Sequence, residues 1–143
     1  MNIAALRLQA VIQPKINAKL KFKNMSTTSI GRQAETIAAE YLQKEFSLSL
    51  VAQNWRTRTC EIDLIMQKEQ EIYFIEVKYR KNNFAGGGLQ SITPTKLNQM
   101  ELASQEFLEQ NPEYQEHQTY LSAIELSGQK PKVSCFIESI AIN

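Results

Sequence analysis

Residues 61–80 read EIDLIMQKEQEIYFIEVKYR, two largely apolar stretches separated by the polar pair Glu69-Gln70. Ile, Leu, Val, Tyr and Phe dominate both stretches, and apolar runs of this kind bounded by polar residues are typical of strands. A two-residue turn at Glu69-Gln70 joins them as an antiparallel hairpin in which Asp63 faces Glu76. The sequence therefore predicts a hairpin that brings two carboxylates together near the middle of a sheet.

The charged residues of this hairpin support two interpretations. Residues two apart in a strand share a face, so Glu61 lies beside Asp63 and Glu76 beside Lys78, and the same register places Glu61 opposite Lys78. Adjacent buried carboxylates repel each other, and a divalent cation held by Asp63 and Glu76 offsets that cost. Lys78 can then neutralise a phosphate or orient a water. The alternative is a solvated charged face with one cross-strand ion pair.

Helical and strand patterns flank the hairpin on both sides. An apolar stripe predicts a helix over residues 29–45, capped by Ser29 or Thr28 and carrying Glu35 in its first turn. A second stripe follows Thr93-Pro94, a cap with proline at the first helical position, and ends before Asn111. Further strands are predicted over residues 48–55, 120–126 and 133–142. The order α-β-β-β-α-β-β predicts a mixed α/β sheet flanked by helices.

The composition is that of a globular protein of one domain. Of the 143 residues, 43% are hydrophobic and 22% are charged, and one domain typically takes ~100–200 residues. Apolar runs such as residues 72–75 are far shorter than the roughly 20 residues of a membrane-spanning helix, so we expect no membrane partner. Cys60 and Cys135 are the only cysteines. They form no CxxC pair, which argues against a disulfide framework and favours the cytoplasm.

Charge is distributed unevenly along the chain. Five of the 16 basic residues and none of the 15 acidic ones lie in residues 1–30, so the remainder has an excess of acid. Residues 1–24 fit a targeting segment, a basic arm for nucleic acid, or an extension that results from a start assigned too early, with Met25 as the true first residue. We expect these residues to be disordered or mis-assigned, and residues 25–143 to form the domain.

Four short motifs occur in order along the chain. They are Gly31-Arg32-Gln33-Ala34-Glu35, Asn54-Trp55-Arg56, Glu61-Ile62-Asp63-Leu64-Ile65 and Ile75-Glu76-Val77-Lys78-Tyr79-Arg80. An Asp followed at a distance by Glu-x-Lys resembles the PD-(D/E)xK superfamily of restriction-endonuclease-like proteins. The whole set resembles the UPF0102 (YraN-type) family, which is related to Holliday-junction resolvases. This resemblance implies a restriction-endonuclease-like mixed sheet flanked by helices, with an α-β-β-β-α-β core.

The resemblance also implies a nuclease site. Asp63 and Glu76 match its metal ligands, for Mg²⁺ or Mn²⁺, and Lys78 matches the superfamily lysine. Glu35 resembles the helix glutamate that completes such sites, and Lys96 resembles the lysine that opens the second long helix. The implied activity is metal-dependent hydrolysis of phosphodiesters in DNA, branched DNA included, or in RNA. The alternative is a non-catalytic nucleic-acid-binding module with a nuclease-derived fold.

Basic residues surround these positions in the sequence. Such a group either follows a phosphate backbone or simply keeps the surface solvated. Lys96 stands out because a cation in the first turn of a helix opposes the helix dipole, which indicates a nearby anion. We expect Lys96 and the Gly86–Gly88 connector to help position phosphate, with DNA favoured over RNA as the partner and a homodimer as one form of assembly. The predicted nucleic-acid-binding residues are Arg56, Arg58, Arg80, Lys81 and Lys96.

Overall fold

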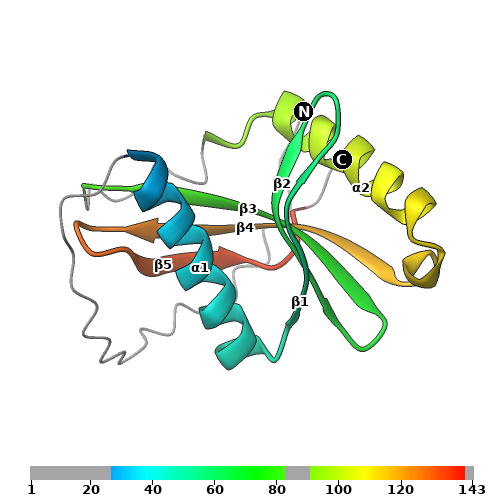
Figure 1. Ribbon diagram of the computed structural model, residues 1–143, viewed down its shortest axis with the longest axis horizontal. Coiled ribbons are helices and arrows are strands. Elements are labelled where there is room, and N and C mark those ends of the chain that lie inside the picture. The colour runs from blue at the N-terminus through cyan, green and yellow to red at the C-terminus, as the bar shows by residue number, and fades with distance from the viewer. Residues whose placement is uncertain (1–26, 83–90, 141–143) are drawn as a thin grey trace.

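The structure is a computed structural model that describes residues 27–82 and 91–140 (Figure 1). Its elements follow the predicted order, with one short 3-10 helix added before β4. They are α1 (Thr27–Phe46), β1 (Ser49–Arg56), β2 (Glu61–Lys68), β3 (Glu71–Arg80), α2 (Pro94–Gln110), η2 (Pro112–Tyr114), β4 (Gln118–Ser127) and β5 (Lys132–Ile137). The predicted extension over residues 1–24 and the Gly86–Gly88 connector lie outside the described residues.

The strands form one mixed sheet in the order β1-β2-β3-β4-β5. Strands β3 and β4 are parallel, and the other neighbours are antiparallel. A parallel pair needs a long crossover, which α2 provides between β3 and β4. This is the mixed α/β architecture that was predicted, and it is consistent with a restriction-endonuclease-like core. No helix in the described part of the chain is long and apolar enough to cross a membrane.

Alternate side chains of β3 divide the core between the two faces of the sheet. Tyr73 and Ile75 pack with Leu42 and other apolar residues of α1. Ile72 and Phe74 pack with apolar residues of α2. One helix therefore covers each face. Because successive side chains alternate, Glu76 and Lys78 point to the same side of the sheet as α2.

The β2–β3 hairpin has the predicted register as far as its pairing extends. The paired positions run from Lys68 opposite Glu71 to Leu64 opposite Ile75, and Glu69 has a φ of 52°, in the left-handed region. Beyond Leu64 and Ile75 the strands part: β3 continues beside β4 to Arg80, whereas β2 stays paired with β1. Figure 1 shows this fork in the sheet. Asp63 and Glu76 lie at its base, directly beyond the last pair.

Two predicted boundaries were wrong. Helix α1 begins at Thr27, so Ser29 lies inside it and Glu35 sits well beyond the first turn, which holds no acidic residue; Ser and Thr favour caps but also tolerate helical positions. Strand β5 ends at Ile137 rather than at residue 142. The chain bends away there because Ser122 Oγ donates a hydrogen bond to the Glu138 carbonyl, and the Ile140 N–H donates to the Leu121 carbonyl.

Candidate functional site

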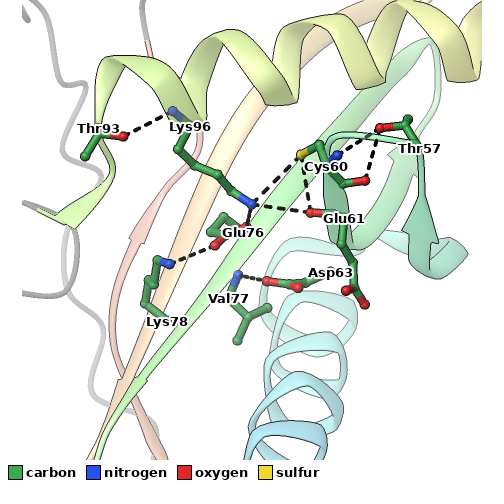
Figure 2. Close-up of polar contacts among 9 residues, drawn as sticks. All are labelled: Thr57, Cys60, Glu61, Asp63, Glu76, Val77, Lys78, Thr93 and Lys96. Atoms are coloured by element: carbon green, nitrogen blue, oxygen red, sulfur yellow. Dashed lines mark hydrogen bonds and ion pairs between the residues drawn. The ribbon is translucent and has the colours of Figure 1, made fainter.

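Asp63 marks the point where β2 changes its orientation in the sheet. Leu64 and Met66 pack on the α1 side, whereas Ile62 packs on the α2 side, although strict alternation would put all three on one face. At this irregularity Asp63 Oδ2 accepts a hydrogen bond of 2.7 Å from the backbone N–H of Val77 (Figure 2). The carboxylate therefore bridges the two strands where their backbone pairing ends.

Glu76 is a buried carboxylate held between two lysines. Its side chain is only 8% exposed, Oε1 lies 2.8 Å from Lys78 Nζ, and Oε2 lies 3.0 Å from Lys96 Nζ. The Oε2 contact is an ion pair without hydrogen-bond geometry, which leaves this buried oxygen without a hydrogen-bond partner. Figure 2 shows the two ammonium groups reaching Glu76 from β3 and from α2. Each oxygen of Glu76 therefore has one ammonium group beside it.

Lys96 owes its position to the start of α2. Thr93 caps the helix, as predicted: its Oγ1 accepts a hydrogen bond of 3.1 Å from the Lys96 N–H, and Pro94 is the first helical residue. The Lys96 ammonium lies 3.4 Å from the Glu61 carbonyl oxygen and 3.9 Å from Cys60 Sγ. Burial is the largest single influence and opposes its charge, but Glu76, Cys60 and Asp63 together outweigh burial and raise the pKa of Lys96. Within the described chain, the anionic partner of Lys96 is Glu76.

The Asp63 carboxyl is destabilised in its charged form. Burial is the main cause, the charge of Glu76 adds to it, and together they raise the pKa of Asp63 from 3.8 to about 7. The Val77 hydrogen bond and the charge of Lys96 work in the opposite direction without cancelling the rise. Strongly perturbed carboxyls of this kind concentrate at functional sites, although structural networks also produce them.

Glu35 approaches this pair from α1. Its Oε2 accepts a hydrogen bond of 2.8 Å from Asn54 Nδ2 in β1, and its charge contributes to the raised pKa of Asp63. The contact with Asn54 escaped the sequence analysis, in which Asn54 figured only within a motif. One signal was available: Asn is depleted in strands, so an Asn inside a predicted strand invites a reason for its presence.

The predicted pairing of Glu61 with Lys78 is wrong. The fork separates β2 from β3 before these residues meet, and β1 lies opposite Glu61 instead. Glu61 therefore pairs with Arg56, whose Nη2 lies 3.1 Å from Glu61 Oε2, and both side chains are at least one-third exposed. An exposed ion pair of this kind contributes at most about 1 kcal/mol to stability.

Four of the five predicted nucleic-acid-binding residues lie on the two arms of the fork. Arg56 and Arg58 are exposed at the β1–β2 end, and Arg80 and Lys81 are exposed where β3 ends. The ion pairs seen on Glu76 in residues 27–82 and 91–140 come instead from Lys78 and Lys96. The structure thus brings Asp63, Glu76, Lys78 and Lys96 together, with Glu35 beside them.

The donor atoms at the fork suit a hard divalent cation in part. Within the described ranges, no three carboxylate, imidazole or thiol groups are gathered as a metal cage. Mg²⁺, however, commonly uses one or two protein carboxylates and keeps several waters. Asp63 and Glu76 supply two such carboxylates, and Glu76 Oε2 is a buried acceptor without a hydrogen bond. The residues therefore fit an ion that keeps much of its water shell.

Comparison with known proteins identifies the family. The sequence profile described as "Uncharacterised protein family UPF0102" matches residues 34–130. A UPF0102 protein of Pseudomonas putida strain GB-1 is 39% identical over 103 residues, which cover 72% of this chain and 83% of the relative. A UPF0102 protein of Vibrio parahaemolyticus is 41% identical over 85 residues, which cover 59% of this chain and 69% of the relative. The chain belongs to the UPF0102 family.

Proposed function

We propose that this protein is a nuclease that uses Mg²⁺ or Mn²⁺ to hydrolyse phosphodiesters. The observation that carries the proposal is the group at the base of the fork, where Asp63 and Glu76 meet beside Lys78. Two carboxylates that repel each other form a site for a cation, and an adjacent ammonium suits the charge of a phosphate. The membership in UPF0102 is consistent with this proposal and does not by itself specify an activity.

Each residue has a role in this proposal. Asp63 and Glu76 hold the ion, which when bound supplies a Lewis acid for phosphodiester hydrolysis. Lys78 stabilises negative charge that develops on the phosphate, since its ammonium lies at the fork and its side chain is 32% exposed. Lys96 neutralises Glu76 from the other side and approaches the phosphate from the start of α2. Glu35 contributes a further carboxylate from α1.

We propose nucleic acid as the partner, with DNA, branched DNA included, favoured over RNA. The exposed basic residues on both arms of the fork support this choice, because phosphate contacts supply most of the affinity for nucleic acids. A homodimer would suit a substrate in which two strands are cut, since symmetric pairs are the commonest assemblies. Outside residues 1–30 the chain has more acidic than basic residues, so contacts with phosphate would come from local basic groups rather than from the whole surface.

A second candidate is a nucleic-acid-binding module that does not cut. The observation that favours it is the pairing of both Glu76 oxygens with ammonium groups. That pairing gives Glu76 a structural role, which is to hold Lys78 and Lys96 in place for a phosphate. A protein of this kind binds phosphate backbones in the absence of divalent metal and loses nothing when Asp63 is made neutral.

Cleavage assays separate the two candidates. End-labelled branched DNA, duplex DNA, single-stranded DNA and RNA are incubated with Mg²⁺, Mn²⁺ or EDTA, and binding to the same substrates is measured in parallel. Metal-dependent cleavage that is lost in Asp63→Asn and in Glu76→Gln, and kept in the exposed-site control Glu113→Gln, supports the nuclease. Binding without cleavage under every condition supports the module.

A further inference from the structure

Asn54 occupies an unusual position in β1. Its φ of 50° lies in the left-handed region, which non-glycine residues enter rarely and Asn more readily than most. The pairs on either side of it are regular, with Gln53 opposite Leu64 and Trp55 opposite Ile62. Asn54 therefore stands across from Asp63, in a backbone conformation that costs the strand stability.

In this conformation the side chain of Asn54 contacts Glu35. Its Nδ2 donates the 2.8 Å hydrogen bond to Glu35 Oε2, which joins the edge strand β1 to α1 across 19 residues of sequence. Asp63 and Glu35 repel each other, so a partly exposed Glu35 would gain by turning toward water. The amide of Asn54 counteracts this tendency because a hydrogen bond to a charged acceptor is stronger than one between neutral groups.

We propose that Asn54 is a positioning residue that holds Glu35 as an outer carboxylate of the metal site. This inference rests on the nuclease function proposed above and adds a residue to it. Glu35 belongs to no three-ligand cage in the described residues; held beside Asp63, it would add negative charge around the ion that Asp63 and Glu76 would bind. Partners that orient a metal's surroundings commonly change affinity by about 10–100-fold when they are removed.

The test measures Mn²⁺ and Mg²⁺ affinity by calorimetry in four proteins and a control. Asn54→Gly removes the amide and keeps a residue that accepts a left-handed backbone. It should weaken binding about 10-fold, by the same reasoning as for other outer-shell partners. Glu35→Gln should weaken binding similarly, and the double variant should be no weaker than Glu35→Gln because Asn54 acts through Glu35. Gln53→Gly loosens the same exposed strand without touching Glu35 and should bind like wild type.

A second measurement needs no variant. During a Mg²⁺ titration of the ¹³C,¹⁵N-labelled wild type, the Asn54 side-chain amide and the Glu35 carboxyl resonances should shift with one midpoint. Metal binding that is unchanged in Asn54→Gly, additive losses in the double variant, or an Asn54 amide that does not respond would each overturn the role of Asn54 while the proposed function stands. A wild type that binds neither metal would overturn the proposed function and this inference with it.

Discussion

The substitution Asp63→Asn tests whether the two carboxylates at the fork are strained without metal. Asn keeps the shape of the side chain and a carbonyl oxygen that can accept the Val77 N–H bond. It removes the charge that burial and Glu76 oppose. We therefore expect the metal-free variant to be at least as stable as wild type at low pH and clearly more stable at pH 8.

The size of the effect follows from the pKa of Asp63. The pKa of Asp63 is about 7 in the folded protein and 3.8 in an ordinary, solvated carboxyl. The folded protein therefore binds this proton more tightly than the unfolded chain does. This contribution to stability is fully present below about pH 4 and is lost as pH rises through about 7. At 1.36 kcal/mol per pKa unit, the whole difference is worth about 4 kcal/mol as an upper value. Residual contact of Asp63 with solvent reduces it, so we expect about 2–4 kcal/mol.

The assay is thermal unfolding between pH 5 and pH 8 in EDTA, followed by the fluorescence of Trp55, the single tryptophan. For a domain of this size, 1 kcal/mol shifts the midpoint by roughly 4 °C. Because part of the loss already occurs between about pH 4 and pH 5, the range from pH 5 to pH 8 samples about 1–2.5 kcal/mol of it, and the wild-type midpoint should fall by about 5–10 °C relative to Asp63→Asn. Glu113→Gln, which neutralises an exposed carboxyl away from the fork, should track wild type. Asp63 is also the only aspartate in the chain, so ¹³C-labelled aspartate gives one carboxyl resonance that reports its pKa directly.

Added Mg²⁺ should stabilise the wild type but not the Asp63→Asn variant. At pH 8, Mg²⁺ at ten times its Kd should stabilise the native state by about 1.4 kcal/mol through mass action, and Asp63→Asn should lose this gain. A wild-type midpoint that does not fall relative to the variant between pH 5 and pH 8 would refute the strain at Asp63. If the wild-type midpoint falls with pH but does not rise when Mg²⁺ is added, the strain at Asp63 is supported. The proposed nuclease is then refuted in favour of the binding module.

Two further predictions concern the surroundings of the fork. Lys96→Ala should weaken nucleic-acid binding similarly across sequences and lower the salt dependence by about one phosphate contact; Lys68→Ala, at the closed end of the hairpin, is the control, and an unchanged salt slope would confine Lys96 to its contact with Glu76. A chain that begins at Met25 should keep its unfolding midpoint within error; a large loss of stability would show that residues 1–24 pack on the domain.

The fold was largely predictable because its local signals agree with its tertiary structure. The apolar stripes of both helices and the Thr93-Pro94 start of α2 were found in the sequence and are present in the structure. The β2–β3 register was also correct, although Glu69-Gln70 is a poor turn sequence, because the buried faces of both strands fix it. The predicted start of α1 and the predicted end of β5 were wrong. At β5, the hydrogen bond from Ser122 to the Glu138 carbonyl and the bend of the chain end the strand early.

The candidate site was predictable only within the hairpin itself. Proximity of Asp63 and Glu76 followed from the register, and both lie at the base of the fork. Lys96 on Glu76 and Asn54 on Glu35 are contacts between elements distant in sequence, and no local pattern places them. The prediction for Glu61 failed because continuous pairing was assumed along β2 and β3, where the sheet in fact divides.

The fork itself explains why a site can form at this place in the sheet. In a continuous ladder, neighbouring backbone groups satisfy each other and leave no room for a side chain between the strands. Where β2 leaves β3, the Val77 N–H becomes available and Asp63 accepts it, so the opening supplies a donor for one buried carboxylate. The second carboxylate, Glu76, lies on the α2 side, where Lys78 of the same strand reaches one of its oxygens and Lys96 reaches the other from α2. The divergence of β2 from β3 thus makes room for the two carboxylates. Helix α2, the crossover that the parallel strands β3 and β4 require, places the Lys96 ammonium against Glu76.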